Sequence, residues 1–542
     1  MWRRVFGVSV NHRSNRLLSQ YLGITCPAWR GSPPVASVPP ASGERLCGPG
    51  ANPLSLTFLP DREHRLRRLV RRPSRLAGAA RYGRPVPTPG APTPPQGSRD
   101  DPGLRRTILR LAVPAFLTLI AEPLFLLADS AIIGHLGTVE LAGLGVASAV
   151  LTTAAGLFVF LAYGTTALVA RALGAATLRE AVGAGLDGVW LAGVLGLASA
   201  LIVGVGAETL AAAFGPSPPV LAAATTYLRI SALGLPAMLL TMATTGILRG
   251  LQDTRTPLIA TTVAATANVA LNVGLVYGVG LGIAGSAWGT VIAQTGLAAA
   301  LLTVVARAGH RLRAPLRPHP RRVARAAADG FPLLVRTLAL RGVLLASTWA
   351  AASLGDVPLA AYQVSATVWT FLTFALDALA IAAQALVGRA LGAGDVAGAR
   401  DLTAVMTRWG LWFGVALGVL LTAAHTALPP MFTPDPDVRA ALAAALLVVA
   451  LCQPISGIAF VLDGVLIGAG DARWLAGAQT VLLLGYAPLA VAIVRSADRL
   501  TAAGDPVAVV VLWGAFVAFM ALRAAILRVR ARTDAWMVTG AR

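Results

Sequence analysis

Long apolar segments alternate with short polar stretches from residue 107 to near the end of the chain. A transmembrane helix needs about 20 largely apolar residues to cross the hydrocarbon core of a bilayer. We place twelve such helices at residues 107–134, 142–171, 181–206, 218–248, 256–279, 282–306, 324–351, 358–389, 401–427, 438–468, 473–495 and 506–528. Gly and Pro interrupt several of them, as membrane helices tolerate. The pattern therefore predicts an all-α polytopic membrane protein with twelve transmembrane helices.

Arginines mark every second connection between these segments. Arg106 precedes the first segment, and the connection between the sixth and seventh segments carries seven arginines from Arg307 to Arg325. Loops 135–141 and 207–217, on the opposite side, contain none. Positively charged loops stay in the cytoplasm, so we expect both termini to be cytoplasmic, which agrees with an even number of spans.

The membrane region contains an internal repeat at a fixed offset of 218 residues. Residues 167–175 (ALVARALGA) align with residues 385–393 (ALVGRALGA). Further pairs at the same offset are Pro236 with Pro454, Gly246 with Gly464 and Asp253 with Asp471. Six spans per repeat give both repeats the same orientation, and parallel repeats that enclose a midplane site are a transporter architecture. We therefore expect two six-helix lobes.

Most of the residues outside the two repeats precede the first predicted helix. We expect a disordered Arg- and Pro-rich extension over residues 1–103, because residues 1–100 hold 15 of the 35 prolines and no apolar run of spanning length. No secretory signal is expected, whereas an organellar targeting peptide and a misplaced start codon stay open as alternatives. The other boundaries place an amino-terminal lobe at 104–310, a basic linker at 311–323, a carboxyl-terminal lobe at 324–530 and a cytoplasmic tail at 531–542.

The amino-acid composition indicates a protein that is surrounded by lipid rather than one that binds nucleic acid. The chain is 56% hydrophobic and 13% charged, whereas soluble domains average about 25% charged residues. Of the 45 basic residues behind the net charge of +21, 16 lie in residues 1–100, so no nucleic-acid partner is expected. Every basic residue is Arg, which with the high Gly content indicates a GC-rich genome and a bacterial cell membrane. Three cysteines are too few for a disulfide framework or a metal site, and we expect no resident cofactor.

The two repeats differ in a few polar positions inside the predicted helices. Asp129 in the first span corresponds to Ser347 in the seventh, and Asn268 corresponds to Tyr486. Asn272, four residues after Asn268 and on the same helix face, corresponds to Ala490. An acid inside the hydrocarbon region is costly and indicates a functional site by default. We therefore predict that the chemistry lies in the amino-terminal lobe.

Several of these segments resemble one transporter family. Residues 121–137 (AEPLFLLADSAIIGHLG) resemble the first helix of multidrug and toxic compound extrusion (MATE) transporters of the DinF-like branch. Residues 248–257 (LRGLQDTRTP) and 282–290 (GIAGSAWGT) resemble the fourth to sixth helices of that family. Residues 376–388 and 462–471 resemble the matching segments of the second half. Because these segments follow in order, the resemblance covers about residues 104–530.

The resemblance implies two lobes that form a V and export amphipathic, often cationic, small molecules against an inward H⁺ or Na⁺ gradient. It places the family's ion site at Asp129, Asn268 and Thr290, with Tyr227 nearby. Asn272 stands where some members have a second acid, so one ionisable group remains and we favour protons over Na⁺. We expect alternating access, in which protonation of Asp129 from outside releases the substrate.

Other residues within the predicted spans are weaker candidates. Glu122 precedes Asp129 by seven residues and shares its helix face, so it is a candidate for the substrate cavity. Asp377 and Asp463 are also intramembrane acids, which could pair with a substrate cation, take a second proton or bond a neighbouring helix. Pro114 is expected to bend the first helix.

Two other functions remain as alternatives to an ion-coupled exporter. A lipid-linked oligosaccharide flippase of the same superfamily would need a cationic cavity for its pyrophosphate. A membrane-embedded enzyme such as a prenyltransferase would need paired acids for Mg²⁺ near the membrane surface, and the Asp100–Asp101 pair lies in the predicted linker. We therefore expect a non-enzymatic transporter, monomeric in the bilayer, with a small molecule as its partner.

Overall fold

A computed structural model of the chain describes residues 102–175, 178–315 and 317–540, without the side chains at positions 102, 122 and 125. The predicted amino-terminal extension therefore lies almost entirely outside the described residues. The first half contains α3 (Pro102–Gly134), α4 (Thr138–Phe158), α5 (Phe160–Ala175), α6 (Leu178–Val205), α7 (Ala207–Ala212), α8 (Pro218–Ala232), α9 (Leu235–Gly250), α10 (Arg255–Val273), the π-helical turn η2 (Gly274–Gly278) and α11 (Ile283–Arg311). The second half contains α12 (Pro320–Ser353), α13 (Asp356–Gly392), α14 (Val396–Ala424), α15 (Pro429–Phe432), α16 (Pro436–Gly468), α17 (Ala472–Arg495), α18 (Ala497–Ala502) and α19 (Asp505–Arg532).

The described helices match the predicted membrane spans in number and order. Eleven of them are long and apolar enough to cross a bilayer, with α4 and α5 together forming one span from Thr138 to Ala175. The pair α8 and α9 provides a twelfth span, which is bent by 50° at its break. The prediction of an all-α polytopic protein with twelve transmembrane helices is confirmed.

The bend between α8 and α9 has no counterpart in the second half. Gly234 and Pro236 lie at the break, and a proline in the first turn of a helix lacks the N–H that would continue the preceding turn. The repeat-equivalent Pro454 lies inside α16, which continues from Pro436 to Gly468. The residue equivalent to Gly234 is the buried Cys452, so the more permissive glycine accompanies the bent helix.

Equivalent close contacts between helices recur in both halves. A Cβ on Gly196 of α6 would lie 2.6 Å from the Cα of Pro236, and a Cβ on Gly414 of α14 would lie 2.8 Å from the Cα of Pro454. Both pairs are related by the 218-residue offset. Small residues let membrane helices approach closely where apolar surface alone does not favour association, so the repeat is preserved in the packing.

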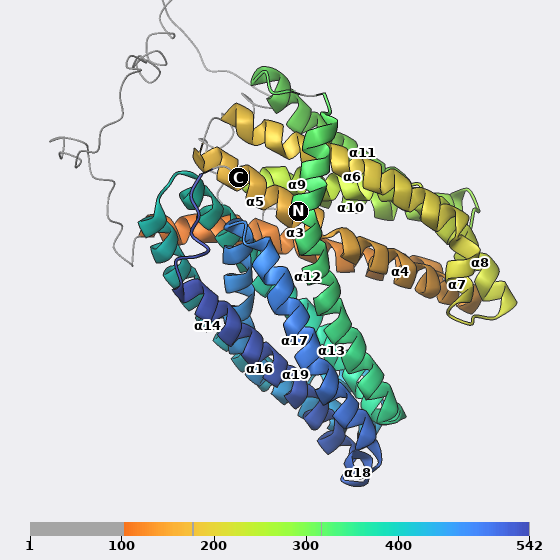
Figure 1. The fold of residues 1–542 in the computed structure, drawn as a ribbon. Coiled ribbons are helices and arrows are strands. Elements are labelled where there is room, and N and C mark those ends of the chain that lie inside the picture. The colour runs from red at the N-terminus through yellow and green to blue at the C-terminus, as the bar shows by residue number, and fades with distance from the viewer. Residues whose placement is uncertain (1–101, 176–177, 316, 541–542) are drawn as a thin grey trace, which may run out of the picture. The chain divides into compact units, whose positions relative to one another are not determined.

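The two lobes meet where α5 and α13 cross. A Cβ on Gly174 would collide with the carbonyl oxygen of Arg389, and a Cβ on Gly392 would collide with that of Arg171. The contact is reciprocal, as expected when one axis relates two parallel repeats. From this crossing the lobes diverge, and α7 and α18 lie at the far ends of the two arms (Figure 1).

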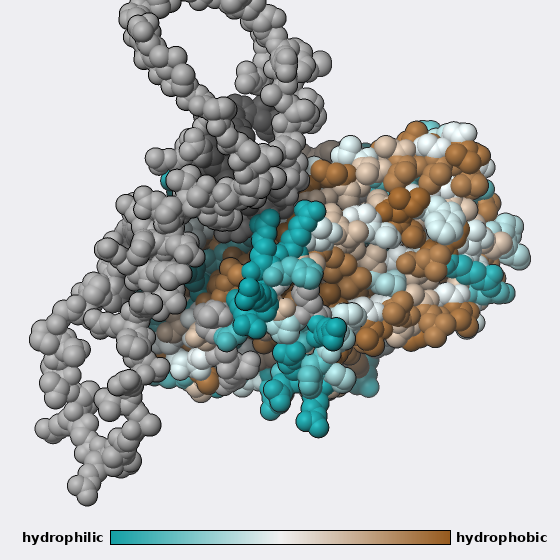
Figure 2. Space-filling view, turned by 90° about the horizontal axis from the view of Figure 1, so that it is seen from above, coloured by the Kyte–Doolittle hydropathy of each residue, from teal (hydrophilic) through white to brown (hydrophobic). Residues whose placement is uncertain are grey.

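Exposed arginines gather where α11 ends and α12 begins, among them Arg307, Arg311, Arg313, Arg321 and Arg322. Figure 2 views this end from above and shows hydrophobic residues over the flank beside it. Polar ends and apolar flanks are the surface expected of a helical bundle embedded in a bilayer.

Candidate ion-coupling and substrate site

Asp129 lies in the last two turns of α3 and is buried, with 4% of its surface exposed. The other predicted site residues come from three separate elements. They are Tyr227 in α8, Asn268 and Asn272 in α10 and Thr290 in α11. The structure brings all five together in the amino-terminal lobe, around the carboxyl group of Asp129.

Both oxygens of the Asp129 carboxyl group accept hydrogen bonds. The Asn272 side-chain N–H donates to Oδ1, and the Thr290 hydroxyl donates to Oδ2 across 3.4 Å. Asn268 supports both donors, since its amide nitrogen donates to the Thr290 hydroxyl at 3.1 Å and its oxygen accepts from Asn272 at 3.4 Å. Tyr227 is buried beside Thr290, within electrostatic reach of Asp129. Each oxygen of the carboxyl group therefore has a hydrogen-bond donor.

Close backbone packing allows the contact between Asn272 and Asp129. A Cβ on Gly289 of α11 would overlap the side-chain oxygen of Asn272. That oxygen is buried and accepts no hydrogen bond from the described residues. Glycine at position 289 therefore makes room for Asn272 between α10 and α11, with its N–H toward the carboxyl group.

The second lobe holds a neutral hydrogen bond at the equivalent place. Ser347 replaces Asp129 and Tyr486 replaces Asn268, and their hydroxyl groups lie 2.7 Å apart. Both are buried, with 1% of each exposed. Polar side chains thus occupy the equivalent position in both repeats, but the carboxyl group occurs in the first repeat.

A cavity of about 300 Å³ adjoins the site within the amino-terminal lobe. Asp129, Tyr227, Asn268 and Thr290 line it, and Arg249 of α9 lines it as well. Most of the remaining wall is apolar and includes Leu119, Leu151, Leu235, Met238, Met242 and Leu297. An apolar cavity with a few placed polar groups suits an amphipathic small molecule.

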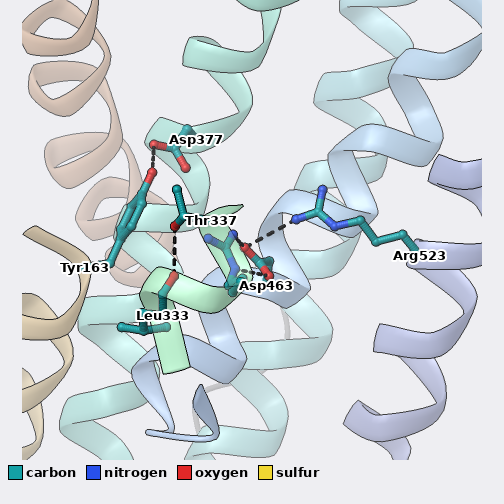
Figure 3. A network of polar contacts seen from close by, with 7 residues as sticks. Tyr163, Leu333, Thr337, Asp377, Asp463 and Arg523 are labelled. Carbon is teal, nitrogen blue, oxygen red and sulfur yellow. Dashed lines mark hydrogen bonds and ion pairs between the residues drawn. The ribbon is translucent and has the colours of Figure 1, made fainter. Parts of the chain in front are cut away.

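A second polar network occupies the carboxyl-terminal lobe and its contact with α5. Arg336 of α12 forms a two-pronged ion pair with Asp463 of α16, and one of its bonds measures 3.1 Å. Arg523 of α19 lies 3.4 Å from the same carboxylate. Figure 3 shows Arg523 reaching Asp463 from its own helix. Asp463 thus has two cationic partners on neighbouring helices. This pairing agrees with the alternative in which the acid bonds a neighbouring helix rather than a substrate or a proton.

Asp377 of α13 bonds across the two lobes rather than within its own. The hydroxyl group of Tyr163 in α5 donates to it at 2.8 Å, as Figure 3 shows. Gln384, two turns further along α13, donates to the backbone carbonyl of Tyr163 at 2.5 Å. These bonds tie the lobes together beside the α5–α13 crossing. Asp377 lies outside the cavity that Asp129 lines.

The structure says less about the two remaining candidate residues, Glu122 and Pro114. The side chain of Glu122 lies outside the described residues. Pro114 lies inside α3, which is continuous from Pro102 to Gly134, and its carbonyl accepts a 2.8 Å bond from the Thr118 hydroxyl.

The MatE family profile matches residues 114–273 and 332–492, which together make up more than half of the chain. The chain belongs to this family. The two matches begin 218 residues apart, so they coincide with the internal repeat and confirm the MATE resemblance. This MATE protein is therefore a multi-pass membrane protein of a family of multidrug and toxin efflux transporters.

Known proteins are similar to this chain over nearly all of its membrane region. Protein DETOXIFICATION 44, chloroplastic, of Arabidopsis thaliana is 30% identical over 460 residues, which cover 82% of this chain and 86% of that protein. DNA damage-inducible protein F of Escherichia coli K12 is 29% identical over 444 residues, which cover 80% and 94%. The structure of a mutant Vibrio cholerae MATE transporter matches with a TM-score of 0.71 and 20% identity, over 80% of this chain and 98% of that one.

Buried arginines are the part of this MATE protein that sequence reasoning largely missed. Arg523 lies inside the predicted span 506–528, and a charge in an apolar span was the signal that could have identified it. Arg249 lies one residue beyond the predicted span 218–248, yet it lines the cavity. Its position in the last turn of α9 explains this, because helical side chains lean toward the helix amino terminus.

Proposed function

We propose that this MATE protein is a proton-coupled antiporter that exports amphipathic, cationic small molecules by alternating access, with Asp129 as the coupling residue. The observation that carries the proposal is the placement of Asp129 in the wall of an otherwise largely apolar cavity. An ionised Asp129 attracts a substrate cation. Protonation removes that attraction, so a single group can bind either a proton or the substrate but not both strongly.

The groups around Asp129 favour a proton over Na⁺ as the coupling ion. Hard cations bind to several oxygen ligands, whereas the Asp129 oxygens face the N–H of Asn272 and the hydroxyl hydrogen of Thr290. Both groups must turn away before a metal ion can take their place. A proton needs only one oxygen, and its arrival requires just one of the two donors to turn.

We further propose that the Arg-rich end of the molecule faces the cytoplasm and that the described conformation is open to the outside. The arginine distribution supports this orientation. The lobes are bonded together around the α5–α13 crossing and diverge toward α7 and α18 (Figure 1). Rocking of the two lobes about this contact would then expose the cavity alternately to each side.

Replacement of Asp129 tests the coupling role. The purified protein is reconstituted in liposomes, and export of a fluorescent cation is followed under an imposed pH gradient or Na⁺ gradient. We expect the wild type to respond to the pH gradient and Asp129→Asn to show background export. Ser347→Ala is the matched control at the equivalent position of the other lobe and should keep its export.

The outcome also separates the two ions. Full gradient-driven export by Asp129→Asn contradicts the coupling role. Export driven by a Na⁺ gradient at constant pH contradicts the choice of the proton while leaving antiport intact. Thermal unfolding of the variant in detergent, compared with that of the wild type, serves as the check that it is folded.

A lipid-linked oligosaccharide flippase is the second candidate, and Arg249 in the cavity wall is the observation that favours it. A pyrophosphate carries at least two negative charges, however, and the cavity offers Arg249 opposite an acid, Asp129. Arg336 and Arg523 are bound to Asp463 and do not line this cavity. The charge balance therefore favours a small molecule over a pyrophosphate lipid.

A further inference from the structure

Arg249 is a buried cation in the wall of the cavity that the proposed coupling mechanism does not use. It has 7% of its surface exposed and lies in the last turn of α9, where its side chain leans back along the helix toward the cavity. Within the described part of the chain, no hydrogen bond and no ion pair under 4.0 Å reaches its guanidinium group. The equivalent residue of the other lobe is the buried, apolar Ile467.

The intramembrane acids of the carboxyl-terminal lobe are already engaged by other groups. Asp377 acts on Arg249 electrostatically, but one of its oxygens accepts the hydrogen bond from Tyr163. Asp463 is occupied by Arg336 and Arg523. A buried charge without a hydrogen-bonded partner is costly, and a guanidinium group is well matched to a carboxylate because it donates two parallel N–H bonds.

Arg249 and Leu235 line the cavity from opposite ends of α9. Leu235, at the start of α9, lines the cavity together with Tyr227 and Asp129, and Arg249 lines it near the end of the same helix. Fourteen helical residues between these positions span about 21 Å. The α9 residues between them that line the cavity are Met238, Thr241, Met242 and Thr245, so a ligand along this helix passes thioether and hydroxyl side chains before it reaches the guanidinium group.

We propose that Arg249 binds an acidic group of the substrate, so that this cavity selects amphipathic zwitterions whose cationic end points toward Asp129. The part of this inference that concerns the cationic end of the substrate rests on the proposed function. The part that concerns its acidic end rests on the contacts of Arg249 alone. It narrows the substrate class from amphipathic cations in general to those that also carry a carboxylate.

Three dyes on one xanthene scaffold provide the test. Rhodamine 110 carries amino groups and a free carboxylate, rhodamine 123 is its methyl ester and a cation, and fluorescein carries the carboxylate without the amino groups. Equilibrium binding to the purified full-length protein is measured by fluorescence anisotropy, without any ion gradient. We expect the wild type to bind rhodamine 110 on the order of tenfold more tightly than rhodamine 123, as one charge-assisted contact provides.

Variants at Arg249 assign that preference to its side chain. Arg249→Gln should bind the two rhodamines equally, whereas Arg249→Lys should retain part of the preference because it keeps the charge. Asp377→Asn should strengthen rhodamine 110 binding, since it removes the acid that partly offsets Arg249. Arg229→Gln, at a surface arginine paired with Glu208, is the control and should bind like the wild type.

Specific results would overturn the inference. Equal binding of both rhodamines by the wild type, or a preference that persists in Arg249→Gln, shows that Arg249 does not bind the acidic group. Tightest binding of fluorescein shows that the cavity takes anions rather than zwitterions. Because binding needs no gradient, failure here is distinct from failure of the proton-coupled export proposal, which the Asp129 variants test.

Discussion

At the residue scale, the two lobes treat buried acids in different ways. Asp129 is held by neutral donors, Asn272 and Thr290, and lines a cavity. Asp463 is held by two arginines within helix packing. Neutral donors leave a carboxyl group able to exchange its charge for a proton, whereas two guanidinium groups stabilise the ionised form throughout. This contrast supports a coupling role for Asp129 and a structural role for Asp463.

Removal of the Asp463 charge should destabilise the protein. Asp463→Asn leaves Arg336 and Arg523 buried without the carboxylate with which both pair, and breaking a buried ion pair on one side costs about 3–5 kcal/mol. Thermal unfolding in detergent measures the loss. Asp534→Asn, which removes an exposed partner of Arg400, is the control and should have little effect. Equal stability of both variants would contradict the structural role.

At the element scale, glycines set how closely the helices approach one another. Gly414 of α14 lies against the backbone of Gln453 and Pro454 in α16, as Gly196 of α6 lies against Pro236. Because lipid is as apolar as the helix surfaces, close packing rather than apolar burial holds such pairs together. The conserved geometry of these contacts at the 218-residue offset explains how two diverged halves keep one fold.

Alanine at Gly414 should therefore be harmful, although alanine is ordinarily the better helix former. Its Cβ would lie 2.8 Å from the Cα of Pro454, and overpacking of this kind costs about 1–3 kcal/mol. Gly477→Ala in α17, where a Cβ meets nothing within 4 Å, should leave the unfolding temperature unchanged or raise it. The prediction fails if the two variants unfold alike.

At the scale of the whole molecule, the carboxyl-terminal tail connects the two lobes. The Arg171 guanidinium group of α5 donates to the carbonyl groups of Val538 and Gly540, each at 2.7 Å. The Gly540 N–H donates to the Leu391 carbonyl of α13 at 3.1 Å. The side chain of Trp536 in the tail is buried, and its indole N–H donates to the Ala531 carbonyl at 3.2 Å. The tail thus bridges the lobes at their crossing, which must open if they rock.

Truncation after Thr533 should favour separation of the lobes at this end. It removes the two hydrogen bonds that join α5 to the tail, of about 0.5–1.5 kcal/mol each, so the equilibrium should shift by at least roughly fivefold. Spin-label distances between α5 and α13 measure the shift. Arg400→Gln, which removes the exposed pair with Asp534 and keeps the tail, is the control. An unchanged distance distribution in the truncated protein would contradict a bridging role.

The twelve spans and the repeat could be predicted from the sequence, because a bilayer requires every spanning segment to be long, apolar and internally hydrogen-bonded. It also indicated Asp129, since an acid among apolar residues stands out and its twin, Ser347, does not carry charge. Which charged side chains meet depends on how the helices pack. Asp463 and Arg336 are 127 residues apart and Asp377 and Tyr163 are 214 apart, and a one-dimensional pattern does not state which helix faces touch. For the same reason, the sequence did not reveal that Arg249 lines the cavity. A residue at the end of a helix cannot be distinguished from a loop residue until the position of its side chain is known.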